Sequence, residues 1–244
     1  MSWQCVDTIP IRVNASVAPA RADAIRSALL RRAVPLSRIV DGRLEPLATA
    51  ALVIDGRRTG LLTAAHIFER VSAGDIAIPL PHDRAVALLR AARVRVVMHA
   101  VSDLAVLWID DALARRLAAN WEACPLPQWQ ADEAAVATYV VAGYPSANVR
   151  RIDGWIYAKP VVLFTAQIDG ACFAYARTAE RTDGLLIHTP ELDGVSGATV
   201  WGVSEESDDG VSCLLRPAAV QVAFQHGRHL RTEPMANAVE LLMI

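Results

Sequence analysis

Three short strings, far apart in the chain and in a defined order, constrain this protein more than any other feature of its sequence. They read TAAH at residues 63–66, DLAVL at 103–107 and GVSG at 194–197. Each string is common alone, at a strand end or in a turn. Together they supply a histidine that can act as a base, an aspartate that can orient it and a serine beside glycines. These are the parts of a Ser-His-Asp triad.

The chemistry of such a triad assigns a role to each residue. The hydroxyl of Ser196 is a weak nucleophile at neutral pH unless a base removes its proton. His66 would take that proton and later return it to the leaving group, while Asp103 would hold the imidazole in the required tautomer. A lone histidine is usually structural or on the surface. We interpret the other five histidines in that way: His82, His99, His188, His226 and His229.

The strings resemble the motifs of the trypsin-like serine peptidases of the chymotrypsin fold. LTAAH at 62–66 and SDLAVL at 102–107 match the histidine and aspartate motifs of that family, and GVSGA at 194–198 matches the serine motif in part. The order His, Asp, Ser is also that of chymotrypsin-type enzymes, whereas subtilisin-like and α/β-hydrolase enzymes use other orders. The resemblance covers roughly residues 46–230.

The resemblance implies an all-β fold of two antiparallel six-stranded β-barrels with short helices at both ends of the chain. His66 and Asp103 would lie in the first barrel and Ser196 in the second, which suits separations of 37 and 93 residues. The expected divisions are an N-terminal extension with a helix over 1–45, the first barrel over 46–125, the second barrel over 126–231 and a C-terminal helix over 232–244.

Local patterns also predict a β-rich chain, because short apolar runs alternate with turn signals. Asp55-Gly56 is a hairpin signal, and Pro79 restricts the strand that contains it to an edge position. Helices are expected over 20–33, 112–121 and 234–243, and a helical turn over 67–71. The expected strands are 47–54, 59–63, 75–80, 92–98, 104–108, 135–142, 155–166, 172–176, 185–188, 198–203, 211–215 and 219–224.

The composition is that of an ordinary globular protein, with 53% apolar and 20% charged residues. The formal net charge of −2 favours neither nucleic acid nor an anionic membrane as a partner. No segment reaches the ~18 apolar residues of a membrane span, and the first 17 residues lack the apolar run of a signal peptide. We therefore expect a cytoplasmic protein. Abundant alanine and a single lysine among 24 basic residues indicate a GC-rich bacterial genome.

The cysteines and the glycine-rich segments indicate no metal and no cofactor. No two of the four cysteines form a close C-x-x-C pair, so a zinc site is not expected, and in the cytoplasm they would be reduced. The sequence contains no P-loop, dinucleotide fingerprint or metal-ligand cluster. The cysteines are Cys5, Cys124, Cys172 and Cys213.

The serine motif departs from the family pattern at one informative position. The resemblance implies an oxyanion hole made by the backbone N–H groups of Gly194 and Ser196. Activated digestive relatives carry an aspartate before the serine, where it pairs with a newly cut N-terminus. Here that residue is Val195, which can pair with no amine. We therefore expect a site that is either preformed or ordered by a partner.

Substrate preference is the next inference from the resemblance. Pro190 stands six residues before the serine, at the base of the family's specificity pocket, so a preference for Arg or Lys is not supported. The neighbouring Glu191 remains within reach of that pocket. Val222, Ala223 and Phe224 are expected to form an apolar wall along which a peptide binds as an added strand. A small or medium apolar side chain before the scissile bond is the expected preference.

These features predict a serine endopeptidase that cleaves a specific protein substrate through an acyl-enzyme intermediate. Because a broad protease would damage its own cytoplasm, we expect gated activity, with the terminal helices as gate or as docking sites for a partner protein. Peptidases of this kind resemble effectors of bacterial stress and antiphage systems. Two alternatives stay open: a catalytically silent double barrel that binds peptides or proteins, and an esterase or transferase that uses the same acyl chemistry.

Overall fold

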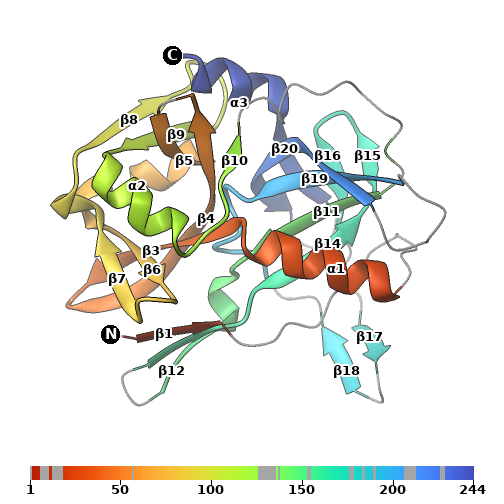
Figure 1. Cartoon of the computed structure of the whole chain (residues 1–244). Coiled ribbons are helices and arrows are strands. Elements are labelled where there is room, and N and C mark those ends of the chain that lie inside the picture. The colour runs from red at the N-terminus through yellow and green to blue at the C-terminus, as the bar shows by residue number, and fades with distance from the viewer. Residues whose placement is uncertain are drawn as a thin grey trace.

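Two antiparallel sheets, one from each half of the chain, make up most of the structure (Figure 1). The computed structural model describes residues 2–5, 11–12, 19–56, 58–125, 136, 138–152, 155–175, 179–182, 185–188, 191–205, 213–225 and 229–244. Within these ranges the chain has three α-helices, and many short strands account for the rest of the regular structure. None of the helices described is long and apolar enough to cross a membrane.

The first sheet closes into a barrel. Its strand order is β7-β6-β3-β4-β5-β9-β8, and all neighbours pair antiparallel. The end strands β7 and β8 are joined along the chain by the 3₁₀ turn Leu89–Ala91, so they act as one interrupted strand and the barrel has six strands. The strands are β3 (Ala33–Val40), β4 (Arg43–Asp55), β5 (Arg58–Ala64), β6 (Ile76–Leu80), β7 (Ala85–Leu88), β8 (Val94–Met98) and β9 (Leu104–Ile109).

The second sheet is built in the same way. Its order is β15-β16-β21-β20-β19-β11-β14, and only Ala166 separates β14 from β15 along the chain, which again gives six strands. The all-β fold of two six-stranded barrels is therefore confirmed. The strands are β11 (Thr138–Gly143), β14 (Val161–Thr165), β15 (Gln167–Asp169), β16 (Cys172–Ala174), β19 (Thr199–Glu205), β20 (Cys213–Gln225) and β21 (His229–Pro234).

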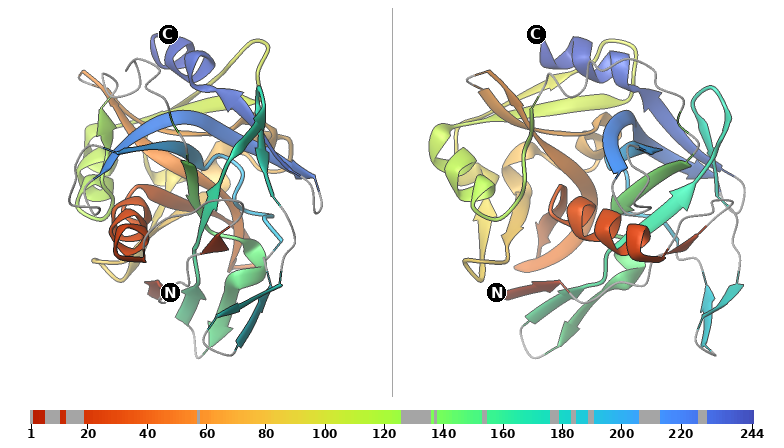
Figure 2. Two further views of the ribbon diagram at one scale, coloured as in Figure 1. Left: turned by 90° about the vertical axis from the view of Figure 1, so that its right-hand side faces the viewer. Right: turned by 45° about the vertical axis from the view of Figure 1, so that its right-hand side comes forward.

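Shorter elements surround the barrels. Two parallel strands extend the sheets: β10 (Cys124–Pro125) beside β4, and β2 (Ile11–Arg12) beside β14. Three further strands form a separate sheet: β1 (Ser2–Cys5), β12 (Val149–Ile152) and β13 (Trp155–Ala158). A hairpin joins β17 (Ala179–Thr182) and β18 (Leu185–His188). The helices α1 (Pro19–Leu30), α2 (Asp111–Ala118) and α3 (Met235–Leu242) lie outside the barrels (Figure 2).

Helix α1 packs against both barrels. Its buried face consists of Ala22, Ile25 and Leu29, each at most 1% exposed. Just after the helix, Arg32 donates a hydrogen bond to Glu122, two residues before β10, at 2.5 Å. The same guanidinium lies 5.4 Å from the ring centroid of Trp201 in β19. Arg32 therefore links the two halves of the chain beside the apolar contact that α1 makes.

The first barrel begins earlier than the boundary expected at residue 46. The expected helix over 20–33 ends at Leu30, and residues 33–40 form β3, which pairs with β4 from Ala33 to Val40. Val34 and Leu36 are at most 1% exposed, so their burial in the barrel explains this strand. It was missed because Pro35 indicates the end of the expected helix, and the segment falls within the expected N-terminal extension.

Prolines account for most of the other differences. The single strand expected over 155–166 is two strands in different sheets, β13 and β14, divided at Pro160, which cannot donate a ladder hydrogen bond. Conversely, the strands expected over 211–215 and 219–224 form one strand, β20, in which a register shift lies beside Pro217. The edge position predicted for the strand of Pro79 is wrong. In β6 only Ile76 and Ala77 pair with β3, which leaves Pro79 free of that ladder.

Candidate active site

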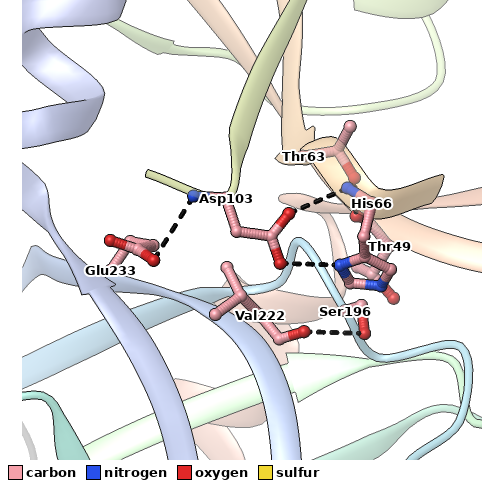
Figure 3. Close-up of polar contacts among 7 residues, drawn as sticks. All are labelled: Thr49, Thr63, His66, Asp103, Ser196, Val222 and Glu233. Carbon is pink, nitrogen blue, oxygen red and sulfur yellow. Dashed lines mark hydrogen bonds and ion pairs between the residues drawn. The ribbon is translucent and has the colours of Figure 1, made fainter. Parts of the chain in front are cut away.

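His66, Asp103 and Ser196 reach one cleft of about 480 Å³ between the two barrels. The cleft is lined from the first barrel by Arg38, Pro46, Leu47, His66, Arg70 and Asp103, and from the second by Ser146, Asp193, Gly194, Ser196, Val222, Ala223 and Phe224. The structure thus brings together three residues that are 37 and 93 positions apart in the sequence. Figure 3 shows them with their polar partners.

Strand pairing places His66 beside Asp103. Strand β5 ends at Ala64, opposite Leu104, where β9 begins. His66 follows the end of β5 in the 3₁₀ turn Ala65–Glu69, and Asp103 comes immediately before β9. The N–H of Ala65 donates to the carbonyl of Asp103 at 3.1 Å, so the backbone ladder continues past the strand ends. Two neighbouring strands therefore deliver the base and the acid to the same point.

Both carboxylate oxygens of Asp103 accept hydrogen bonds from His66. The backbone N–H of His66 lies 2.8 Å from Oδ1, and the ring nitrogen Nδ1 lies 2.8 Å from Oδ2 (Figure 3). A proton on Nδ1 leaves Nε2 as the acceptor of the neutral ring, which is the tautomer that a general base needs. Partial burial acts to raise the pKa of Asp103. The hydrogen bonds and charge of His66, with the charge of Arg231, outweigh it, and the pKa is lowered.

The second barrel also contacts Asp103. Glu233 in β21 accepts a hydrogen bond from the backbone N–H of Asp103 at 3.3 Å, and Asn237 in α3 donates to the other oxygen of Glu233 at 3.4 Å. The C-terminal helix is thereby connected to the His-Asp pair through one side chain. No signal in the sequence marks Glu233, because only the folded arrangement of β21 beside the first barrel places it next to Asp103.

Ser196 is held by backbone contacts with both barrels. Its carbonyl accepts from the N–H of Thr49 in β4 at 2.9 Å, and the next N–H, of Gly197, donates to Gln221 in β20 at 2.7 Å. The hydroxyl of Ser196 donates to the carbonyl of Val222 at 3.4 Å. Among the hydrogen bonds of the described residues, none joins this hydroxyl to His66. In hydrolases that use a Ser-His-Asp triad, that bond is often long without substrate and tightens when substrate is present.

Gly194 has a backbone conformation that residues other than glycine rarely adopt. Its φ is +92°, and a Cβ at this position would lie 2.7 Å from the carbonyl oxygen of Tyr144. The carbonyl of Asp193 accepts from the N–H of Ser146 at 2.6 Å. Because C=O and N–H point in opposite directions in a trans peptide, the N–H of Gly194 points away from Ser146. Of the described groups, none accepts from it, which leaves this donor for a ligand in the cleft.

Gly197 lets the serine loop pack directly on the first barrel. Its φ is +91°, and a Cβ here would lie 2.2 Å from both the carbonyl oxygen of Thr49 and the hydroxyl of Thr63. That hydroxyl donates to the same Thr49 carbonyl at 2.9 Å. The backbone of β4 and the side chain of Thr63 on β5 thus form the surface that supports Ser196 from the side of His66.

Val195 anchors the serine loop by apolar packing. Its side chain is 1% exposed and belongs to the second barrel's core, with Val141, Leu163 and Val200 among its members. A Cβ on Gly143 would lie 2.8 Å from a methyl group of Val195, so β11 approaches this side chain closely. In this chain the residue before Ser196 therefore makes a buried hydrocarbon contact and no ion pair.

The substrate-binding residues expected from the resemblance are placed as follows. Val222, Ala223 and Phe224 line the cleft on the side of β20. Pro190 lies outside the described residues. Glu191 is exposed and lies outside the cleft lining. Sequence reasoning missed the polar residues of the cleft, namely Arg38, Arg70, Ser146 and Asp193. Of these four, only Arg70 could have been suspected from the sequence, because it follows the candidate base His66 by four residues.

Comparisons with known proteins add little. No protein-family model matches the chain, and no curated protein matches it. Solved structures do match. One comes from a study of the coupled folding and binding of the intrinsically disordered VPg protein of Sesbania mosaic virus. It is 13% identical, covers 85% of this chain and 89% of its own, and has a TM-score of 0.49. Any assignment of activity therefore depends on the geometry of the site.

Proposed function

We propose that the chain is a serine endopeptidase with Ser196 as nucleophile, His66 as general base and acid, and Asp103 as the residue that orients the imidazole. One observation carries the proposal: Asp103 holds both the backbone N–H and Nδ1 of His66 at 2.8 Å, in the cleft that also contains the serine. Among the described residues, no three or more His, Cys, Asp and Glu side chains are grouped so that they could hold a metal ion.

The proposed reaction begins with a peptide bound as an added strand along Val222–Phe224. A substrate N–H that bonds to the Val222 carbonyl would displace the Ser196 hydroxyl from it and allow the hydroxyl to turn toward Nε2 of His66. Oγ then attacks the scissile carbonyl while His66 takes the proton. The N–H groups of Gly194 and Ser196 stabilise the oxyanion, a contribution of about 10²–10³ in rate per donor.

The second half of the reaction returns the enzyme to its starting state. His66 gives its proton to the leaving amine, the C–N bond breaks and an acyl ester of Ser196 remains. A water molecule, deprotonated by His66, attacks the ester carbonyl. The C–Oγ bond then breaks, and the proton on His66 returns to Oγ. Apart from the substrate and this water molecule, these steps use only groups of the chain itself.

Labelling with a fluorescent fluorophosphonate tests the proposal. The wild-type chain should react, while Ser196→Ala and His66→Ala should not. Ser72→Ala is the matched control, because this serine hydroxyl bonds to Asp75 on the surface, outside the lining of the cleft. Labelling of Ser196→Ala, or no labelling of folded wild-type protein, would overturn the assignment.

One observation favours the second candidate, a catalytically silent double barrel that binds peptides. The Ser196 hydroxyl bonds to Val222 rather than to His66 in the present arrangement. A silent module would bind peptides with equal affinity before and after Ser196→Ala and would not react with the fluorophosphonate. An esterase or transferase would react with the probe but leave peptide bonds intact, so peptide hydrolysis separates that third possibility.

The cellular role belongs to the same proposal: the enzyme is gated and cleaves one chosen protein in a bacterial cytoplasm, as an effector of stress or antiphage defence. The resemblance of its motifs to those of intracellular peptidases supports this setting. Hydrogen bonds connect Asn237 in α3 to Glu233, and Glu233 to Asp103. This connection supports the C-terminal helix as the place where a docking protein could influence the site. Plating phage on bacteria that express the wild type or Ser196→Ala tests the defence role, and equal plating would contradict it.

A further inference from the structure

The part of the cleft beyond His66 contains two arginines. Arg70 is the residue that follows the 3₁₀ turn carrying His66, and Arg38 lies in β3; both line the cleft. Both also line an adjoining groove of about 410 Å³ that extends along β3 and residues 68–75. A ligand that leaves the triad on this side therefore passes between two guanidinium groups.

The two arginines differ in how their charge is compensated. Arg38 donates to Glu45 through Nε and Nη2, at 3.1 and 2.9 Å, so its charge has a fixed partner. Arg70 is exposed and forms no ion pair with any residue that the structure describes. Two carboxylates, Glu69 and Asp75, line the adjoining groove. Within the catalytic cleft itself, Arg70 is the guanidinium whose charge remains available to a ligand.

The carboxylates of the catalytic cleft do not cancel this charge. Asp103 is engaged by both nitrogens of His66. Asp193 is exposed and belongs to the loop of Gly194, on the second barrel's side of the cleft, whereas Arg70 belongs to the first barrel's side. The guanidinium of Arg70 and the exposed carboxylate of Asp193 therefore lie on opposite walls of the cleft.

The geometry of the triad indicates which part of a substrate meets Arg70. The acyl part of a peptide lies along Val222–Phe224, next to the hydroxyl of Ser196. The leaving amine must receive its proton from His66, so the leaving segment extends to the opposite side, where β4 contacts Ser196 through Thr49 and Leu47 lines the cleft. Arg70, four residues after the base, lines the cleft from the first barrel, as Leu47 does.

We propose that Arg70 selects substrates with a carboxylate side chain at the first or second residue after the scissile bond. The inference rests on the proposed peptidase function and adds a substrate class to it. A guanidinium binds a carboxylate through paired N–H donors. At an exposed site such a pair changes affinity about twofold to fivefold, so the preference is moderate and falls as salt screens the charges.

Acyl transfer tests this preference without knowledge of the residue before the scissile bond. p-Nitrophenyl acetate acetylates Ser196 and releases p-nitrophenolate. An added amine then attacks the acetyl carbonyl, the C–Oγ bond breaks, and the amine's proton passes through His66 to Oγ, which leaves an N-acetyl product. Water competes and gives acetate. The measured quantity is the ratio of N-acetyl product to acetate for Asp-amide against Asn-amide, and for Ala-Asp-amide against Ala-Asn-amide.

The wild type should favour the aspartyl amine of at least one pair by about twofold to fivefold. Arg70→Gln should remove this preference and Arg70→Glu should reverse it. Arg115→Glu, an equal charge change on the exposed face of α2 outside the cleft lining, should retain it. This inference alone would be overturned if the wild type gave the same ratio of N-acetyl product to acetate for the aspartyl and the asparaginyl amine of both pairs. A preference for the aspartyl amine that survives Arg70→Glu would also overturn it. Absence of Ser196-dependent p-nitrophenolate release would instead overturn the proposed function.

Discussion

The two barrels hold the residues of the proposed triad by different means. In the first, His66 and Asp103 extend from the ends of two paired strands, and polar bonds of 2.8 Å between them complete the arrangement. In the second, Ser196 lies in a loop that depends on positive φ at Gly194 and Gly197 and on the buried Val195. The base and acid are positioned by regular secondary structure, whereas the nucleophile is positioned by close packing between loops and barrels.

This difference predicts which kind of substitution should disturb the site in each barrel. A strand pair distributes its geometry over many backbone hydrogen bonds, so single side chains in the first barrel affect chemistry more than position. The backbone hydrogen bonds of the serine loop go to separate segments, such as Thr49 and Gln221, and not to one paired strand. The loop also relies on backbone conformations that only glycine adopts readily. Changes there should displace the nucleophile even when the rest of the fold is intact.

The largest expected effect comes from Asp103→Asn, which alters the chemistry of the first barrel's pair. The amide can donate to Nδ1 and favour the wrong tautomer, so the rate of peptide hydrolysis should fall by about 10⁴. Thermal unfolding of the variant should still be cooperative. A loss below tenfold would show that Asp103 does not orient the base.

Gly197→Ala should break the placement of the nucleophile. The strained φ costs about 1–2 kcal/mol, and the new Cβ would overlap Thr49 and Thr63, so both stability and fluorophosphonate labelling should fall. Gly170→Ala is the matched control, because its φ is +43° but nothing lies within 4 Å of the added Cβ. Equal losses of stability in the two variants, measured by urea unfolding, would contradict the packing argument.

Val195→Ala tests whether apolar packing in the second barrel affects the site as well as the stability of the fold. Removing two buried methyl groups should lower the free energy of unfolding by about 2 kcal/mol. The same change at Val34 in the first barrel, also fully buried, should cost a similar amount. Only Val195→Ala should slow labelling by the fluorophosphonate, because only that cavity loosens the loop of Gly194 and Ser196. Equal labelling rates would mean that apolar packing does not set the site.

The smallest effect is the pH dependence of the first barrel's pair. The folded pKa of Asp103 is lowered, so the stability contributed by its charged form is fully present above the unfolded pKa of about 3.9. That contribution is lost as pH falls through the lower, folded pKa. The stability difference between wild type and Asp103→Asn, measured by urea unfolding, should therefore shrink between pH 5 and pH 2. A difference that grows on acidification would contradict the assignment.

Much of the fold could be predicted because its signals are local. The strand that ends before His66 and the strand that begins after Asp103 were expected within one or two residues, since apolar runs and turn residues mark their ends. Strand β3 was missed, although it contains β-branched residues, because Pro35 indicates the end of the preceding helix and the strand's pairing with β4 and β6 is a tertiary contact. The division at Pro160 was missed because the apolar run continues on both sides of the proline.

Taken alone, the sequence determined the residue types of the proposed triad and their order, and the family resemblance of these motifs implied the two-barrel fold class. Motif letters and apolar runs can be recognised in a sequence because they are properties of neighbouring residues. Only the tertiary structure decided what surrounds them: Glu233 beside Asp103, Val195 in the second core, and Arg70 in the cleft, where it has no ion pair among the described residues. These depend on contacts between segments up to 130 residues apart. Such contacts follow from barrel closure and side-chain packing, which no local pattern encodes.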